Sequence, residues 1–328
     1  MRPILLFLLL SSVLSAQYRL YTCMENSKDY VVGAKLPLSG VFVKSAASEW
    51  QHLGYNLPFV SALDYDTHDP STLYLAAGNG LIRASDYGRV WKILTSFDVT
   101  ELRDLAVDRN VPGAIYFAHT HGIRVTHDSG TTWHEISNGL KRKYTESIRV
   151  DRKHAGRLVA GMEDGLYLSD NGGGSWRRAG AAGFQILHIE QSPHDPCFWV
   201  AVTQQGGAFV SSDCAGSFES LGNVGVGRNL YDVAFDPTTK GRFALAGWGP
   251  GVLVTEDNGK TWQSRNVGLP QTEVRSVAFD PDKPGRLYAS IHEQALYVSQ
   301  DSGLNWNKSG LDGSVVYRMV FIPAEGKR

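Results

Sequence analysis

Three carboxylates are the best candidates for acid–base chemistry in this sequence: Glu146, Glu163 and Asp164. A glycosidase needs two carboxyl groups, one to protonate the leaving oxygen and one to act as nucleophile or base. No spacing selects such a pair here, and neither a Gly-x-Ser-x-Gly nucleophile motif nor a phosphate-cradling glycine loop occurs. We therefore expect no catalytic residue. A glycoside hydrolase that uses Glu146, Glu163 or Asp164 remains the alternative.

Metal chemistry is not expected either. His119 and His121 are separated by one residue, but two ligands do not make a metal site without a third and a fourth. We predict no metal and no cofactor.

Other residues are suited to recognition. One position of a repeated segment, where the chain enters the first strand of each repeat, is occupied in turn by Ser61, Arg103, Glu146, Leu187, Tyr231, Arg275 and Tyr317. Arginine and tyrosine recognise carboxylates, sugars and protein surfaces. We predict binding through Arg103, Tyr231, Arg275 and Tyr317. A solvated rim without a dedicated ligand is the alternative.

Trp248 joins this candidate binding set because it lies on a glycine-rich loop. An indole there could stack on a sugar or insert into a partner, whereas packing against a neighbouring loop is equally compatible with the sequence.

A repeated aromatic residue indicates the elements that position these side chains. At intervals of 41 to 44 residues the sequence carries Trp50, Trp91, Trp133, Trp176, Phe218, Trp262 and Trp306. A repeat of 40 to 45 residues is the length of one four-stranded propeller blade. The spacing therefore predicts an all-β fold, a seven-bladed β-propeller of four-stranded antiparallel blades.

The tryptophans end a short motif, seen best in Thr126-x-Asp128-x-Gly130-x-Thr132-Trp133. Asp and Thr side chains accept hydrogen bonds from turn amides, and glycine adopts the positive φ of a tight hairpin. Because the motif recurs in every repeat, we predict structural roles for its members. These are Asp86, Asp128, Asn171, Asp213, Asp257, Asp301, Trp91, Trp133, Trp176, Trp262 and Trp306.

The two ends of the sequence are out of phase with the repeat. The last repeat adds a single strand at Val316 to Pro323, whereas the start supplies three strands at Tyr30 to Ala34, Gly40 to Lys44 and Trp50 to Leu53. We predict that Val316 to Ile322 pairs with Tyr30 to Ala34. The N- and C-terminal strands would then share one blade and close the ring without an open edge.

The motif resembles the Asp-box of the BNR repeat superfamily, over residues 29–323. That superfamily includes sialidases, family 74 xyloglucanases, sortilin and the photosystem II stability and assembly factors. Sialidases need an Arg-Ile-Pro segment, where this chain has Phe321-Ile322-Pro323, and family 74 enzymes place their acids between two propellers. The resemblance to the assembly factors implies a non-catalytic scaffold whose arginine face, here Arg103, Arg228 and Arg275, contacts a protein.

The N-terminus predicts export. Arg2 precedes an apolar run from residue 4 to residue 14, and Ala16 supplies a small residue at the expected cut. We expect residues 1–16 to be a signal peptide and residues 17–328 to be one propeller domain, periplasmic or extracellular. The apolar run is too short to span a membrane.

With 32 basic and 33 acidic residues, the net charge of −1 gives no argument for nucleic acid. We expect a protein or glycan partner on the channel-mouth face and a monomer.

Of the three cysteines, Cys197 and Cys214 flank a predicted hairpin whose antiparallel pairing would place them side by side. We predict a disulfide between them. Cys23 is then an unpaired thiol in an N-terminal segment that we expect to be weakly constrained.

Overall fold

The computed structural model describes residues 17–28, 31, 34–35, 37–45 and 49–324. Every regular element in this part of the chain is a β-strand, from β1 to β28, which confirms the all-β prediction. None of the described residues forms a helix with the length and hydropathy needed to cross a membrane. The predicted signal peptide, residues 1–16, lies outside the described residues.

The strands form antiparallel groups of four. The first group, in spatial order, contains β28 (Ser314–Pro323), β1 (Tyr18–Asn26), β2 (Gly40–Lys44) and β3 (Trp50–Leu53). The next contains β4 (Val60–Tyr65), β5 (Leu73–Ala77), β6 (Gly80–Ser85) and β7 (Val90–Ile93). It is followed by β8 (Leu102–Val107), β9 (Ile115–His119), β10 (Gly122–Thr126) and β11 (His134–Glu135). The fourth contains β12 (Thr145–Val150), β13 (Leu158–Met162), β14 (Gly165–Ser169) and β15 (Arg177–Gly180).

Two further groups are joined into one eight-stranded sheet by pairing of β17 with β20. One contains β16 (Ile186–Gln191), β17 (Trp199–Gly206), β18 (Ala208–Ser211) and β19 (Glu219–Ser220). The other contains β20 (Val226–Phe235), β21 (Phe243–Gly247), β22 (Gly251–Thr255) and β23 (Gln263–Ser264). The last sheet contains β24 (Val274–Phe279), β25 (Leu287–Ile291), β26 (Ala295–Ser299) and β27 (Asn307–Gly310).

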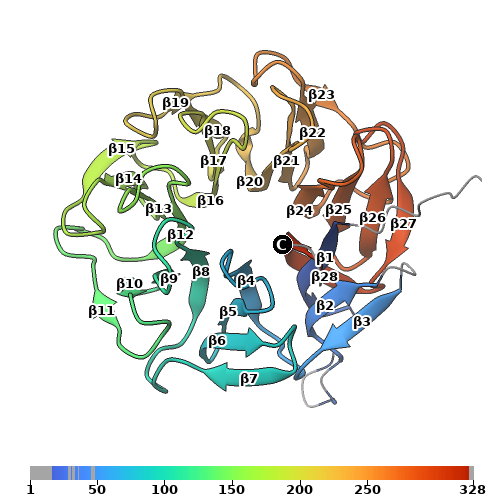
Figure 1. The fold of residues 1–328 in the computed structure, drawn as a ribbon. Coiled ribbons are helices and arrows are strands. Elements are labelled where there is room, and N and C mark those ends of the chain that lie inside the picture. The colour runs from blue at the N-terminus through green and yellow to red at the C-terminus, as the bar shows by residue number, and fades with distance from the viewer. Residues whose placement is uncertain (1–16, 29–30, 32–33, 36, 46–48, 325–328) are drawn as a thin grey trace, which may run out of the picture.

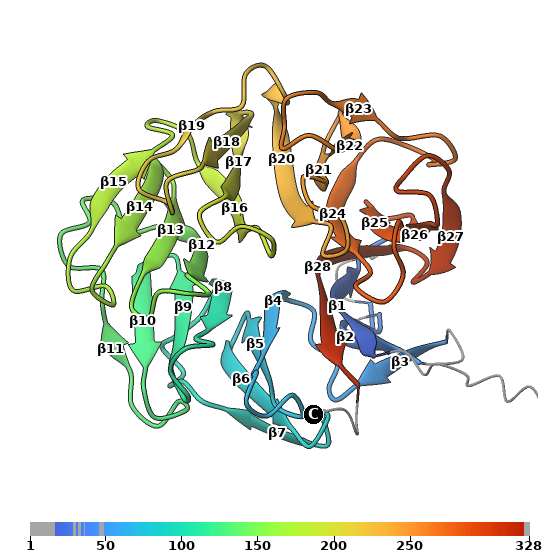
Figure 2. The same cartoon turned by 45° about the horizontal axis from the view of Figure 1, so that its top comes forward.

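Figures 1 and 2 show the sheets standing around a central axis, as the blades of a propeller do. Each group contributes one strand nearest the axis, and residues of these strands line a central cavity that we call the channel: β4, β8, β12, β16, β20, β24 and β28. The second strands β5, β9, β13, β21 and β25 are buried at every position. Neighbouring sheets cover both faces of these strands, which explains their mostly apolar sequences.

The N- and C-terminal strands share a sheet, but not in the predicted register. β28 pairs with β1 from Tyr18↔Pro323 to Asn26↔Ser314, so the prediction that it pairs with Tyr30 to Ala34 is wrong. β1 buries five consecutive side chains, from Leu20 to Met24, and this burial favours its place beside β28. Within the segment that the sequence predicted to pair with β28, Tyr30, Val32 and Gly33 lie outside the described residues.

The turn after the third strand of a sheet is held by side chains. Asp128 accepts hydrogen bonds from the Thr126 hydroxyl at 2.6 Å, and from the amide and hydroxyl of Thr132 at 2.8 and 2.7 Å. Equivalent hydrogen bonds to Thr261 and Asn305 hold the pKa values of Asp257 and Asp301 at about 2. Asn171 and Asp213 accept hydrogen bonds from Ser169 and Ser211. Asp86 has Ala84 instead of a hydroxyl residue two positions earlier, and it pairs with Arg89.

The indoles of these turns connect neighbouring sheets. Trp133, Trp176 and Trp306 donate Nε1–H to carbonyl oxygens about one repeat earlier, those of Leu94, Ile136 and Arg265. Trp91 and Trp262 instead donate within their own turns. Phe218 has no such donor.

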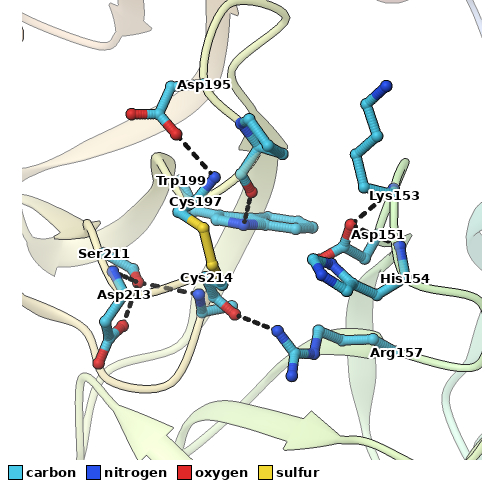
Figure 3. Close-up of a disulfide and its surroundings, with 12 residues drawn as sticks. Asp151, Lys153, His154, Arg157, Asp195, Cys197, Trp199, Ser211, Asp213 and Cys214 are labelled. Atoms are coloured by element: carbon cyan, nitrogen blue, oxygen red, sulfur yellow. Dashed lines mark hydrogen bonds and ion pairs between the residues drawn. A yellow bond between two sulfur atoms is a disulfide. The ribbon is translucent and has the colours of Figure 1, made fainter.

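The turn with Phe218 carries a covalent link instead. Cys197 and Cys214 form a disulfide (Figure 3). The Cys214 amide also donates a hydrogen bond to the Cys197 carbonyl. Other sheets have the same hydrogen bond between a glycine carbonyl and the turn, for example from Ser129 to Gly113. Cys23 is fully buried within β1, so the expectation of a weakly constrained thiol is wrong.

Candidate binding site at the channel mouth

Each innermost strand has a β-bulge, which falls at the second residue of β4, β8, β12, β16 and β24 and further along the longer strands β20 and β28. In every case the bulge falls at the residue that the alignment of the repeats selected: Ser61, Arg103, Glu146, Leu187, Tyr231, Arg275 and Tyr317. A bulge leaves one residue without a cross-strand partner and redirects its side chain. These seven side chains therefore occupy equivalent positions at one end of the channel, which we call the channel mouth.

Arg275 lies at the centre of one cluster at this mouth. Its guanidinium carbon lies 4.7 Å from the ring centroid of Tyr231 and 5.3 Å from that of Tyr317. Burial lowers the pKa of Arg275, yet the guanidinium forms no hydrogen bond or ion pair with any described residue. Two aromatic rings thus hold a cation whose N–H groups lack an acceptor within the described chain.

The rings around Arg275 are fixed in turn. Tyr317 donates its hydroxyl to Glu25 at 2.9 Å, and burial together with this carboxylate raises the pKa of Tyr317 to about 12. Trp248 packs against Tyr231 with ring centroids 5.4 Å apart and against His292 at 5.0 Å. Trp248 is 38% exposed, so this indole packs against its neighbours and also faces solvent.

Arg103 is placed differently. Its Nε and Nη2 groups donate to the two carboxylate oxygens of Glu146 at 2.9 and 2.7 Å, and the guanidinium lies 5.8 Å from the ring of Tyr144. The structure therefore brings Tyr231, Arg275, Tyr317 and Trp248 together, and leaves Arg103 in a separate ion pair on β8 and β12.

All three candidate catalytic carboxylates are paired with arginine. Glu146 binds Arg103, Glu163 lies 3.1 Å from Arg142, and Asp164 lies 2.7 Å from Arg178 and accepts from Tyr167. The described residues also contain no group of three His, Cys, Asp or Glu side chains placed to hold a metal ion.

Apolar side chains surround the mouth on the connections into the inner strands. Phe97 is 96% exposed between β7 and β8, and Phe59, Phe184 and Val226 are exposed before β4, before β16 and at the start of β20. Exposed apolar side chains beside unpaired polar groups are typical of binding surfaces.

A polar network crosses the channel below the mouth. Arg318 of β28 contacts His188 of β16 and Asp104 of β8, and Arg149 of β12 contacts the same two residues. Burial opposes ionisation of Asp104, but the two arginines outweigh it and lower its pKa. Both arginines approach Nε2 of His188, and Nδ1 of the same ring lies 2.5 Å from a carboxylate oxygen of Asp232.

The sequence analysis missed this network and also Tyr144 and Glu25. A signal was present, because Asp104, His188, Asp232 and Arg318 each directly follow a selected residue along the chain. The position after each bulged residue in the repeat therefore supplies four of the residues that cross the channel.

Comparisons with known proteins bear on the fold. No family model matches the sequence, and no curated protein sequence matches it. Among solved structures, the Niastella koreensis GH74 enzyme has a TM-score of 0.70 at 18% identity, covering 84% of this chain and 51% of its own. The GH74 xyloglucanase from Xanthomonas campestris has a TM-score of 0.62 at 19% identity, covering 76% and 45%.

A structure of YCF48 bound to a D1 peptide is also similar, with a TM-score of 0.62 at 18% identity, covering 82% of this chain and 93% of YCF48. The chain folds as a β-propeller of the kind found in these proteins. It spans about half the length of the two GH74 structures.

Proposed function

We propose that this chain is an exported, non-catalytic propeller that binds a protein partner at the channel mouth. In this proposal the ring has seven blades, each a four-stranded group, and is closed by the sheet that β28 shares with β1. The ordered groups of four and the terminal pairing support this count. A glycoside hydrolase using Glu146, Glu163 or Asp164 is the alternative, which the similarity to GH74 enzymes keeps open.

The observation that carries the proposal is the unpaired Arg275 between Tyr231 and Tyr317. Placing a guanidinium between aromatic rings costs desolvation energy, and an external acceptor would offset that cost through charge-assisted hydrogen bonds. The candidate catalytic acids, by contrast, already have arginine partners. The residues at the mouth are therefore better suited to binding a partner than to acid–base catalysis.

A protein partner fits the mouth better than a glycan. Trp248 contacts Tyr231 and His292, which leaves less of its indole free as a stacking platform. The separate exposed side chains of Phe97, Phe184 and Val226 resemble anchors of a protein interface. The bound D1 peptide shows that one propeller of similar fold and length takes a polypeptide.

Export is supported by the leader-like N-terminus and by the disulfide, since disulfides persist in oxidising compartments. We propose a periplasmic or extracellular monomer.

The test uses the chain from residue 17 to residue 328, immobilised and exposed to the envelope or secreted fraction of its source. Arg275→Ala should lower capture of a specific partner at least about tenfold, the loss expected for a charge-assisted contact. Arg89→Ala, on the opposite turns and paired with Asp86, is the matched control and should leave capture unchanged.

The same preparation is screened against polysaccharides and aryl glycosides. Capture that is insensitive to Arg275→Ala would contradict the proposed surface. Hydrolysis that disappears in Glu146→Gln, Glu163→Gln or Asp164→Asn would establish the enzyme alternative.

A further inference from the structure

We propose that the end of the channel opposite the mouth is a separate binding pocket for a small oxyanion, either a carboxylate or a phosphate, held by Arg109 and Arg152. None of the residues predicted to bind belongs to it. The inference does not depend on the function proposed for the mouth.

A cavity of about 450 Å³ occupies this end. Its wall includes the later parts of the inner strands and the turns that follow them, with Arg109 and Arg152 among the lining residues. Arg103 is the second residue of β8 and Arg109 lies two residues beyond its end, a separation of six residues or about 20 Å. The volume is in the range of small-molecule pockets.

The cavity is separated from the mouth by the network across the channel. Arg318 reaches from β28 to both His188 and Asp104, and all three residues line the inner end of the cavity. A ligand would therefore enter from the side of Arg109 and Arg152.

Arginines at the outer end exceed the carboxylates that pair with them. Arg109 stacks 5.6 Å from the ring of Tyr65, is exposed, and forms no ion pair with any described residue. Arg152 donates through Nη2 to Glu190 at 2.6 Å, and the same glutamate lies 3.6 Å from Nε of Arg149. Glu190 thus serves both Arg149 and Arg152, Arg149 is paired with Asp104 as well, and Arg109 forms no ion pair with a described carboxylate.

The other lining carboxylates accept hydrogen bonds from the chain, and Asp151 accepts those of the Lys153 and His154 amides and of the Gln191 side chain. The charge of Arg109 opposes the burial that raises the pKa of Asp64. Asp64 accepts the amides of Tyr65 and Val107, and Asp232 accepts those of Val233 and Val277. Asp104 is shared by Arg149 and Arg318.

The positive charges close to Arg152 also favour a bound anion. Burial is the main cause that lowers the pKa of Arg152, and the neighbouring charges of Arg109 and Arg149 lower it further, against the effect of Glu190. An anion placed between like charges in a partly enclosed cavity relieves this repulsion. Arginine also suits a carboxylate or phosphate because its planar fork donates two parallel hydrogen bonds.

The test is isothermal titration calorimetry of the chain from residue 17 to residue 328, with inorganic phosphate and citrate as probes in a low-salt buffer. We expect one site. Arg109→Ala and Arg152→Ala should each weaken binding at least about tenfold. Arg89→Ala, on the same face but outside the cavity, and Arg275→Ala, at the mouth, should not change it.

The variant Glu190→Gln should change the affinity for the probe in the opposite direction. It removes the carboxylate that competes for Arg152, so binding should become tighter.

Binding of phosphate alone would identify a phosphorylated ligand, and binding of citrate alone would identify a carboxylate ligand. Either result supports the pocket. The proposal is overturned if neither probe binds, if both arginine variants bind like wild type, if chloride competes equally, or if Glu190→Gln fails to tighten binding. Failure here with Arg275-dependent capture intact would leave the function of the mouth unaffected.

Discussion

Arg103 and Glu146 bind each other across adjacent inner strands, with two hydrogen bonds of 2.9 and 2.7 Å. Both are bulged residues, on β8 and β12. The same bulge position on β24 holds Arg275, which has two tyrosines beside it and no carboxylate partner among the described residues. One structural position therefore yields an internal ion pair in one part of the ring and a free guanidinium in another.

Replacing Glu146 by Gln should destabilise the protein by about 1 kcal/mol, since Arg103 loses its charged partner. The effect is modest because the Arg103 side chain is 38% exposed and solvent screens the pair. Urea unfolding would measure the change. Glu163→Gln, whose partner Arg142 is more exposed, is the control and should have almost no effect. Equal stability of Glu146→Gln and wild type would show that the pair contributes nothing.

The sequence predicted the antiparallel groups of four strands, and it aligned the positions where the chain enters each inner strand, because both follow from the repeat. That these positions are β-bulges emerged only from the structure. The box turns depend on local hydrogen bonds, which residue types largely determine. The pairing of β28 was predicted with the wrong partner, since the first strand lies next to a leader-like segment and carries no repeat signal.

The contacts within the site could not be derived in this way. That Arg103 is paired and Arg275 unpaired depends on which neighbour lies beside each bulge, and a repeat alignment does not contain that information. Arg318 meets His188 across 130 residues of sequence. Such a contact arises only when the sheets surround a common axis.

Loss of the disulfide should lower the free energy of unfolding by about 3 kcal/mol, the value expected for a loop of this size. The cysteines are 17 residues apart and join turns on the one sheet whose box ends in Phe218 rather than Trp. Urea unfolding of Cys197→Ser/Cys214→Ser would measure the loss. Reducing agent should destabilise wild type similarly and leave the double variant unchanged. A midpoint shared by wild type and variant would show that the link has no stabilising role.

Cys23 should not react in the native protein. The thiol is completely buried in β1, and burial raises its pKa well above the usual range, so almost no thiolate is present at neutral pH. A colorimetric thiol reagent should titrate no cysteine in the folded chain and one after denaturation without reductant. Rapid labelling under native conditions would mean that β1 leaves β28 readily. Cys23→Ala, which removes the only free thiol, is the control for the assignment.

Acidification should destabilise the fold through His188. Burial lowers the native pKa of His188 well below its ordinary value, and Arg318 and Arg149 lower it further. Near pH 6.5 and below, the unfolded chain therefore binds a proton that the native state rejects, and stability falls by up to about 1.4 kcal/mol per pH unit for this group.

The measurement is the free energy of unfolding between pH 7.5 and 5, in wild type and His188→Gln. The variant should show a smaller slope but not a flat line, because burial also lowers the pKa of His119. Among the other groups in the network, Asp104 and Glu190 have lowered pKa values and lose their contribution only at still lower pH. Burial raises the pKa of Asp232, whose protonation on acidification acts in the opposite direction. A slope that is the same in both proteins would show that His188 does not set the acid sensitivity of the channel network.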